Sequence, residues 1–339
     1  DGNGYKLPDE VEDELEKYVR QSADNELARP TGDGIGTIEY NSNLAHLYAH
    51  FVRHTIDTSL EGLTIVYDGA NGAASSVGPE ILSGLGAKVI NINVNPDGLN
   101  INHHCGSTHI EGLQVAVQQH NADLGIANDG DADRCLLVDE KGQVLDGDQI
   151  MLLCALKLKK EGKLKDDTVV GTVMSNIGFH KAAEELGMKT VSTAVGDRYV
   201  LEYMREHDLS VGGEQSGHVI FLDHNTTGDG MLTAVQVAAL MKEKNQPLSE
   251  LASIMTKYPQ VLVNVRVATK TGWEDNDIIK AAIVTAEGEL GDEGRVLVRA
   301  SGTEPLIRVM AEGPNQEELQ SLCQEIADII GREQGLAEK

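Results

Sequence analysis

The sequence predicts an α/β protein with two consecutive mixed α/β sheet domains and a smaller C-terminal α+β domain. Three observations predict this fold class. Short apolar strands alternate with helical segments from residue 63 to residue 213, a pattern typical of parallel sheets with crossover helices. The alternation restarts after a turn at residues 140–143, and near the C-terminus two strands follow each other directly. The 339 residues also allow two or three cores, because domains usually span ~100 to 150 residues.

The predicted elements fall into three blocks, which we take as domains at residues 43–143, 144–257 and 258–339, with Tyr258-Pro259 at the last boundary. Apolar spacing predicts amphipathic helices at 8–20 and 44–56. The first block then has strands at 63–67, 88–92 and 123–127, with helices ending at 81 and spanning 111–120. The second has helices at 148–160, 179–186, 198–206, 230–242 and 248–256 around strands at 168–173, 189–193 and 209–213. The third has strands at 261–267, 295–300 and 306–310 and helices at 274–287 and 316–330.

The charge and the cysteines limit the classes of partner and compartment. A formal net charge of -26 repels nucleic acid and anionic membrane surfaces, so we expect neither as a partner. An anionic ligand must therefore meet a local cationic pocket. The four cysteines are widely spaced and form no C-x-x-C pair, which favours a reducing cytoplasm over a disulfide framework or a zinc cluster. No apolar run approaches the ~20 residues that cross a bilayer.

Three aspartates, Asp129, Asp131 and Asp133, alternate in a segment that follows a predicted parallel strand. The carboxyl ends of such strands are where open α/β sheets bind ligands. Carboxylates at alternate positions of an extended segment point the same way and repel each other, and a divalent cation relieves the repulsion. Ligands that are all oxygen favour Mg²⁺ or Ca²⁺ over zinc. This segment is therefore the candidate metal site.

The same segment has two other interpretations. Asp129, Asp131, Asp133 and Glu140 fall at positions 1, 3, 5 and 12 of a helix-loop-helix calcium site. However, Arg134 stands where that loop needs glycine, and the flanks have the pattern of strands rather than helices. An acidic, solvated turn is the plain alternative, and the dense apolar residues on both sides disfavour it.

A second polar segment, Gly-Gly-Glu-Gln-Ser-Gly-His at 212–218, lies between two apolar strands. Glu214, Ser216 and His218 offer donors and acceptors suited to hydroxyls or an amine, and Gly217 lets a ligand approach the backbone. Taken alone, the segment could equally be a polar hairpin. Arg198, in Gly-Asp-Arg-Tyr at 196–199, could reach a phosphate or serve only at a helix end.

A third segment, Arg-Ala-Ser-Gly-Thr-Glu-Pro-Leu-Ile-Arg at 299–308, joins two predicted strands. Guanidinium groups bind phosphate in a bidentate manner, and hydroxyls and freed backbone N–H groups complete a cradle for an anion. Such a cradle would be the cationic pocket that the acidic chain requires, although a turn held by buried salt bridges is also possible. Its candidate residues are Arg299, Ser301, Gly302, Thr303 and Arg308.

Taken in order, the three segments resemble those of the α-D-phosphohexomutase family. Asp-Gly-Asp-Ala-Asp-Arg resembles its metal loop, Gly-Glu-Gln-Ser-Gly-His its sugar loop and Arg-Ala-Ser-Gly-Thr-Glu-Pro its phosphate loop. The sequences of the last two, together with Val-Gly-Asp-Arg-Tyr-Val at 195–200 and Cys-Gly-Ser-Thr-His at 105–109, are most similar to the phosphoglucosamine mutase branch. The resemblance implies an isomerase with four domains around a cleft. It would interconvert glucosamine 6-phosphate and glucosamine 1-phosphate through a phosphoserine and a bisphosphate, toward UDP-N-acetylglucosamine and the cell wall.

The resemblance also assigns roles to residues. Asp129, Asp131 and Asp133 would hold Mg²⁺, and Arg134 would steady the phosphoryl group. Glu214, Ser216 and His218, with Gly217 and Arg198 near them, would contact the sugar phosphate. Arg299, Ser301, Gly302, Thr303 and Arg308 would grip the phosphate that does not react. The expected partner is a small sugar phosphate, and a homodimer is left open.

One departure from the family pattern concerns the nucleophile. No serine of the chain stands in the short Thr-x-Ser-Ala/His-x-x-Pro-like motif that carries the family's phosphoserine. We therefore interpret residues 1–42 as the tail of a missing N-terminal catalytic-serine domain, and expect the chain to be inactive alone. A phosphoglucomutase or phosphomannomutase, and a non-catalytic sugar-phosphate-binding module, remain the alternative functions.

Overall fold

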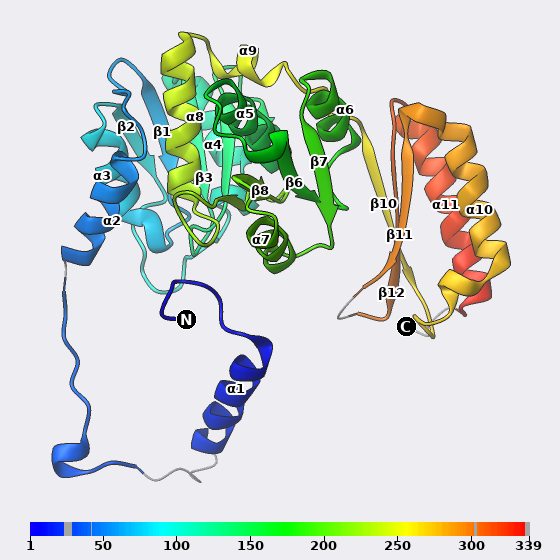
Figure 1. The fold of residues 1–339 in the computed structure, drawn as a ribbon, viewed down its shortest axis with the longest axis horizontal. Coiled ribbons are helices and arrows are strands. Elements are labelled where there is room, and N and C mark those ends of the chain that lie inside the picture. The colour runs from blue at the N-terminus through cyan, green and yellow to red at the C-terminus, as the bar shows by residue number, and fades with distance from the viewer. Residues whose placement is uncertain (24–28, 42, 302–303, 336–339) are drawn as a thin grey trace.

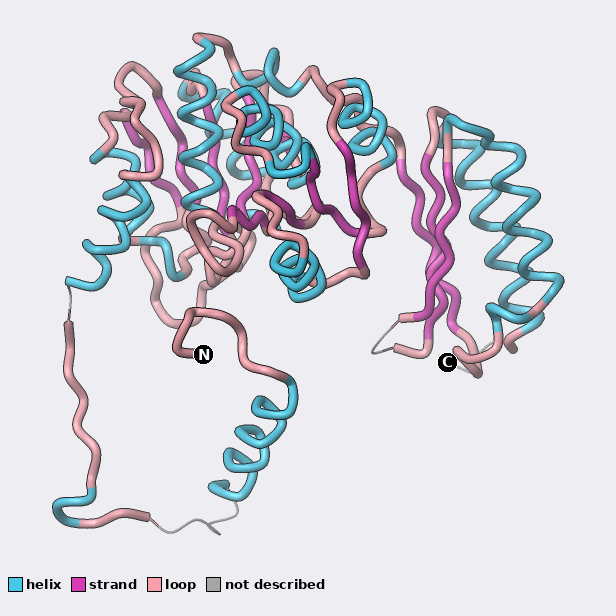
Figure 2. Tube along the Cα trace, in the orientation of Figure 1, coloured by secondary structure: helices cyan, strands magenta, loops and turns pink. Residues whose placement is uncertain are grey.

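The computed structural model describes residues 1–23, 29–41, 43–301 and 304–335. It contains a five-stranded, a four-stranded and a three-stranded sheet in the described part of the chain. The first two sheets are mixed and alternate with helices, and the third is antiparallel with two helices (Figures 1 and 2). The predicted fold class, two mixed α/β sheets followed by a smaller α+β unit, is therefore confirmed.

The first sheet places the predicted metal segment at the end of a hairpin. Its strand order is β2-β1-β3-β4-β5, in which β1, β2 and β3 run parallel and β4 and β5 antiparallel. Residues 129–134 join the carboxyl end of β3 to β4. The strands are β1 (Thr64–Asp68), β2 (Lys88–Ile92), β3 (Leu124–Asn128), β4 (Cys135–Asp139) and β5 (Val144–Leu145), with helices α2 (Asn43–Arg53), α3 (Val77–Gly84) and α4 (Glu111–His120).

The second sheet places the predicted sugar segment at its own hairpin. Its order is β7-β6-β8-β9, with β6, β7 and β8 parallel and β9 antiparallel to β8. Residues 214–218 join β8 to β9. The strands are β6 (Thr168–Thr172), β7 (Lys189–Thr193), β8 (Val211–Gly213) and β9 (Val219–Phe221), with helices α5 (Gly147–Lys160), α6 (Ile177–Glu185), α7 (Asp197–Glu206), α8 (Gly230–Lys244) and α9 (Leu248–Ala252).

These two sheets share one buried core. Helix α8 follows the second sheet in sequence but packs against β3 and β4 of the first, and against α5. Its first twelve residues are buried, because it is apolar on every side and surrounded by protein. One hydrophobic cluster therefore runs from Ala49 to Met255. The proposed domain boundary at residue 143 stays a prediction, and buried side chains pack across it.

The C-terminal unit has its own core. Its sheet order is β10-β12-β11, and alternate side chains of the strands pack with α10 and α11 in a second cluster. In Figure 1 both helices cover the outer side of this sheet, so the other face turns toward the rest of the molecule. The elements are β10 (Gln260–Arg266), α10 (Asp277–Leu290), β11 (Arg295–Ala300), β12 (Leu306–Glu312) and α11 (Gln316–Glu333).

The N-terminal segment lies apart from these cores. Helix α1 (Asp9–Ala23) projects away from the sheets, and its apolar stripe, predicted from Val11, Leu15 and Val19, is exposed in the described structure (Figure 1). Residues before it touch the second α/β unit: Thr226 Oγ1 donates to Gly4 O, and the Arg205 guanidinium stacks 3.8 Å from the Tyr5 ring centroid.

Several helix boundaries differ from the sequence expectation by a few residues. Helix α9 ends at Ala252 rather than near residue 256, and α10 begins at Asp277 rather than 274. The later start of α10 has a local cause, because the Asn276 side chain accepts hydrogen bonds from the N–H groups of Ile278 and Ile279 and caps the helix there. None of the described helices is both long enough and apolar enough to span a bilayer.

Candidate active site

The metal loop, residues 129–134, brings three carboxylates together. Oxygen atoms of Asp129, Asp131 and Asp133 lie within 4.8 Å of one another. Two ligands on opposite sides of Mg²⁺ are ~4.1 Å apart, so a small side-chain movement would let all three reach one ion. Ala132 adopts a left-handed conformation (φ 63°), which turns the chain between the last two aspartates. The alternation seen in the sequence thus becomes a cluster through a tight turn.

Neighbouring elements hold this loop by backbone contacts. The Ala73 N–H donates to Gly130 O (2.8 Å), and the Gly230 N–H at the start of α8 donates to Ala132 O (2.9 Å). A Cβ on Gly72 would lie only 2.2 Å from Gly130 O, so the turn after β1 can approach the loop only because residue 72 is glycine. Buried Asn128 also donates from Nδ2 to Arg134 O (2.8 Å). Elements from both α/β units therefore fix the loop.

The electrostatics of the metal loop favour a bound cation. Burial, with the charges of Asp133 and Asp131, raises the pKa of Asp129 to about 6. The Nε of Arg134 lies 3.7 Å from Asp129 Oδ2 and 3.9 Å from Asp133 Oδ1. Asp133 Oδ1 is nevertheless buried without a hydrogen-bond partner among the described residues. Clustered carboxylates, one with an unmatched buried oxygen, fit an oxygen-ligated divalent ion.

The sugar loop, residues 214–218, lies directly against the metal loop. Arg134 and His218 form an isolated antiparallel β-bridge, and the Cys135 N–H donates to Gly217 O (3.0 Å). His218 is buried, and its Nε2 lies 3.6 Å from Asp133 Oδ2. Gly217 has φ 94°, and a Cβ there would be 2.3 Å from Cys135 O, so glycine is required at this crossing. The two loops are therefore in direct contact.

Glu214 and Ser216 occupy different environments in the sugar loop. The half-buried Glu214 accepts a hydrogen bond at Oε1 from the Gly196 N–H (2.9 Å), whereas Ser216 is exposed. The Gly147 N–H at the start of α5 donates to Gln215 O (2.9 Å). The loop is thus tied to two helix N-terminal regions, and its exposed side is free to meet a ligand.

Arg198 is engaged elsewhere in this structure. Its guanidinium pairs with Asp9, lies 3.4 Å from Glu202 Oε1 and donates to Leu7 O at 3.3 Å. The residue before it, Asp197, lies closer to the loops, because its Oδ2 is 3.7 Å from His218 Nε2. Asp197 also pairs with Lys6. Asp197 and Lys6 were not selected from the sequence. The only sequence signal was the Gly-Asp-Arg-Tyr motif at 196–199, which contains Asp197.

The arginine pair, Arg299 and Arg308, lies on neighbouring strands of the C-terminal sheet. The two residues are directly opposite in the β11–β12 register, so their side chains share one face. Burial and the charge of Arg308 lower the pKa of Arg299, and Arg308 Nε is buried without a hydrogen-bond partner among the described residues. Two adjacent, incompletely paired guanidinium groups favour the binding of an anion between them.

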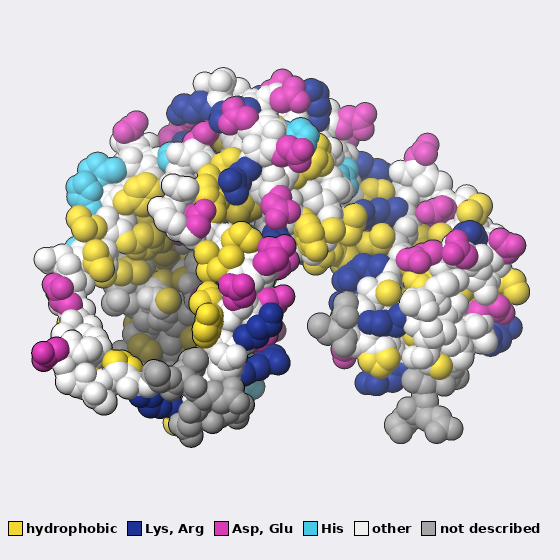
Figure 3. All heavy atoms as spheres, turned by 60° about the horizontal axis from the view of Figure 1, so that its bottom comes forward, with side chains coloured by type: hydrophobic (Ala, Val, Ile, Leu, Met, Phe, Trp, Pro, Cys, Tyr) yellow, Lys and Arg dark blue, Asp and Glu magenta, His cyan; other side chains and the backbone are white. Residues whose placement is uncertain are grey.

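The rest of the predicted phosphate cradle is only partly described. Ser301 is buried, its N–H donates to Leu306 O (2.8 Å), and its carbonyl accepts from Lys270 Nζ (2.6 Å). Lys270 is a further cation near the arginine pair that sequence reasoning did not select. Gly302 and Thr303 lie outside the described residues. In Figure 3, Lys and Arg side chains gather on the side of the C-terminal unit that faces the α/β units.

A pocket opens beside the metal loop. It is lined by Asp131 and Asp133 together with Tyr48, Thr227 and Asp229. A larger pocket between α5, α8 and β9 lies away from these loops and mixes lysines with acidic residues. The pocket at the metal loop is therefore the candidate ligand pocket, because two of the candidate metal ligands line it.

Comparison with known proteins identifies each unit. Models of the phosphoglucomutase/phosphomannomutase family match residues 39–142 (alpha/beta/alpha domain II), 146–258 (alpha/beta/alpha domain III) and 262–329 (C-terminal domain). The chain is 54% identical over 334 residues to the phosphoglucosamine mutase of Symbiobacterium thermophilum, covering 98% of this chain and 74% of that relative. It is 50% identical over 335 residues to that of Bacillus subtilis, covering 99% and 75%.

Solved structures show the same fold. A phosphoglucomutase/phosphomannomutase family protein from Burkholderia thailandensis superposes with a TM-score of 0.74 at 19% identity, covering 96% of this chain and 71% of that one. The N-acetylphosphoglucosamine mutase of Aspergillus fumigatus, solved with GlcNAc-6P and magnesium, gives 0.71 at 22% identity, covering 88% and 67%. At these identities the likeness concerns the fold.

Proposed function

Since the chain belongs to the phosphoglucosamine mutase family of isomerases, we propose that it binds glucosamine phosphates and serves their interconversion between the 6-phosphate and the 1-phosphate. One observation carries the proposal. The sugar loop and the metal loop are joined by the bridge between His218 and Arg134, beside Asp129 and Asp133. A ligand held by the sugar loop would therefore lie next to the metal loop.

The metal loop would serve the reacting phosphate. Asp129, Asp131 and Asp133 would hold Mg²⁺, which when bound neutralises charge on a transferring phosphoryl group. Arg134, whose side chain is 43% exposed beside these carboxylates, can turn toward phosphoryl oxygens without leaving a buried position. Phosphoryl transfer depends mainly on such positioning and charge neutralisation. The phosphoserine donor that the family resemblance implies stays a prediction for this chain.

The other two regions would hold the ends of the sugar phosphate. Glu214, Ser216 and His218 offer acceptors and donors to hydroxyl and amino groups, and Arg299 and Arg308 would bind the phosphate that does not react. In the bisphosphate intermediate, one phosphate would then meet Mg²⁺ and the other would meet the two arginines. This division explains how a chain with a net charge of -26 can bind an anionic substrate.

Calorimetry on the chain tests the proposal. Glucosamine 6-phosphate in the presence of Mg²⁺ should release or absorb heat on binding, and glucose 6-phosphate and mannose 6-phosphate should bind more weakly. Equal binding of all three sugars would favour a phosphoglucomutase or phosphomannomutase. Binding of none would contradict the proposal. Glu214→Gln should reduce the preference for the amino sugar, because an amide cannot form an ion pair with the ammonium group.

Compartment and assembly belong to the same proposal. All four cysteines are unpaired and buried, which is consistent with a cytoplasmic protein. The homodimer and the absence of nucleic-acid and membrane partners stay predictions.

A further inference from the structure

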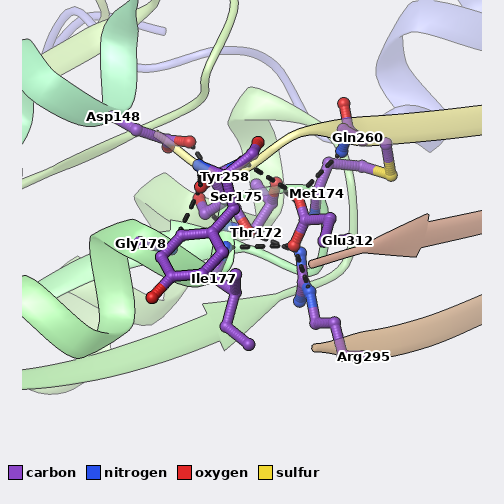
Figure 4. Close-up of polar contacts among 11 residues, drawn as sticks. Asp148, Thr172, Met174, Ser175, Ile177, Gly178, Tyr258, Gln260, Arg295 and Glu312 are labelled. Carbon is purple, nitrogen blue, oxygen red and sulfur yellow. Dashed lines mark hydrogen bonds and ion pairs between the residues drawn. The ribbon is translucent and has the colours of Figure 1, made fainter. Parts of the chain in front are cut away.

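Glu312, the last residue of β12, is a fully buried carboxylate at the junction between the C-terminal unit and the second α/β unit. Four donors meet it (Figure 4). Its Oε1 accepts from Asn176 Nδ2 (3.2 Å) and Gln260 Nε2 (3.0 Å), and its Oε2 accepts from the Ile177 N–H (3.0 Å) and Arg295 Nε (2.6 Å). Two of these donors belong to the C-terminal sheet and two to the start of α6. The carboxylate therefore joins the two units through its own oxygen atoms.

The same cluster holds the connecting chain. Asn176 donates from Nδ2 to Tyr258 O and accepts at Oδ1 from the Tyr258 N–H, both at 3.0 Å. A Cβ on Gly178 would lie 1.9 Å from Thr256 O, so the connection is pressed against the first turn of α6. Arg295 also reaches across, donating from Nη2 to Ser175 O (2.5 Å). The chain between the units has little room to move while this cluster is intact.

The cluster is fixed in turn to the sugar loop. The Asn176 N–H donates to Asp148 Oδ2 (2.8 Å), and Asp148 lies in the first turn of α5. The preceding residue, Gly147, donates to Gln215 O of the sugar loop. A short chain of hydrogen bonds therefore runs from the sugar loop through α5 and Asn176 to Glu312.

The strands that carry Glu312 also carry the arginine pair. Arg295 is opposite Glu312, and Arg299 is opposite Arg308, in one antiparallel register. Each pair is four residues from the other along its strand, so all four side chains lie on one face, ~13 Å apart along the strands. One end of this face is anchored at α6, and the other end holds the guanidinium groups. The orientation of the sheet at its anchored end therefore sets the position of the two guanidinium groups at its other end.

We propose that Glu312, with Arg295, is a positioning residue that places the arginine pair relative to the sugar and metal loops. The inference rests on the proposed function, in which one ligand spans these sites. Neither residue needs to touch that ligand. The carboxylate acts by holding the C-terminal sheet at one orientation.

Glu312→Gln is the most informative variant. All four partners of Glu312 are donors, so the amide nitrogen of glutamine would face donors and at least two of the contacts would be lost. Arg295→Lys is a milder companion, because lysine keeps the charge beside Glu312 but cannot also bridge to Ser175 O. Glu289→Gln, an exposed change on the outer helix α10, is the matched control.

The first measurement does not involve any ligand. Spin labels on cysteines introduced at exposed Glu185 and Glu287 would report the distance between the units, because the four native cysteines are buried. We expect one narrow distance distribution for the parent and for Glu289→Gln, and a broader one for Glu312→Gln, with Arg295→Lys between them. An unchanged distribution in Glu312→Gln would overturn the proposal whether or not the proposed function holds.

The second measurement separates positioning from unfolding. With Mg²⁺ present, Glu312→Gln should bind glucosamine 1,6-bisphosphate about 10- to 100-fold more weakly, the cost of misplacing groups by about 1 Å. Inorganic phosphate needs only the arginine pair, so its affinity should stay within about twofold. Equal loss for both ligands would show that the C-terminal unit has unfolded, and would overturn the proposal. If the parent itself fails to bind the bisphosphate, the proposed function fails, and the label distances still decide the inference.

Discussion

The metal loop and the arginine pair are held in opposite ways. The metal loop is fixed on several sides, by the turn after β1, by the start of α8 and by the sugar loop. The arginine pair lies on a sheet that has its own core and is anchored to the α/β units through the Glu312 cluster. The comparison indicates that the acidic end of the site is preformed, whereas the basic end is placed by the orientation of a whole unit. Substitutions at the two ends should therefore have different consequences.

Gly72→Ala should have the largest effect on the fixed end. Its Cβ would lie 2.2 Å from Gly130 O, so the metal loop must move, at a cost of about 3 kcal/mol in stability. Mg²⁺ affinity, measured by calorimetry, should fall about 10- to 100-fold, as when a residue supporting a metal ligand is lost. Gly112→Ala in α4 is the control, because a Cβ there meets no atom within 4 Å. An unchanged Mg²⁺ affinity in Gly72→Ala would show that the loop is not preformed.

Arg308→Ala should weaken phosphate binding about 10- to 100-fold, which corresponds to the loss of one or two charge-assisted hydrogen bonds. Mg²⁺ binding should stay unchanged, because the arginine pair and the metal loop belong to different units. Titrations with inorganic phosphate and with Mg²⁺ check both expectations. Arg332→Ala, on the exposed side of α11, should change neither. Equal losses of phosphate and Mg²⁺ affinity in Arg308→Ala would remove the distinction between the two ends.

Asp148→Asn should change the pH dependence of stability. Burial, and then the charge of Asp146, raises the pKa of Asp148 to about 7, so the folded protein holds a proton that the unfolded chain releases near pH 4. The free energy of unfolding should therefore fall as the pH rises from about 4 to 7, by up to ~1.4 kcal/mol per pH unit from this residue. Urea unfolding at several pH values should show this slope reduced in Asp148→Asn. Exposed Asp328→Asn should keep the parent slope, and an unchanged slope in Asp148→Asn would contradict the assignment.

Gly288→Ala should have the smallest effect and should stabilise only the C-terminal unit. Residue 288 lies within α10, and a Cβ there meets no atom within 4 Å, so alanine should add about 0.5 to 1 kcal/mol. Gly291 ends the same helix with φ 55°, so Gly291→Ala should instead destabilise the C-terminal unit. Hydrogen exchange would assign each effect to a unit. A shift spread equally over the α/β units would show that the C-terminal unit does not unfold on its own.

The sequence was informative where local patterns carry the chemistry. Three aspartates at alternate positions after an apolar strand indicated the metal loop, and two arginines flanking a turn indicated a pair on adjacent strands. Strand and helix alternation was sufficient for the fold class, because each element has its own apolar period. These signals depend only on residues that are close in sequence.

Other features depend on contacts between distant segments, so no local pattern could reveal them. Helix α8 packs on the first sheet although it follows the second, and Glu312 ends its strand with no motif around it. Arg198 was selected for its charge, yet its guanidinium is paired with Asp9 in this structure. Local sequence shows which groups are present, and tertiary packing decides which of them meet.

The binding of glucosamine 1,6-bisphosphate with and without Mg²⁺ tests the central claim, that one ligand spans the metal loop and the arginine pair. We predict that Mg²⁺ tightens bisphosphate binding by about 10-fold, a typical coupling of 1 to 3 kcal/mol, and tightens that of inorganic phosphate much less. Arg308→Ala and Asp131→Asn should each reduce this coupling. Bisphosphate binding that is indifferent to Mg²⁺ would contradict the claim, because the two ends would then bind their ligands independently.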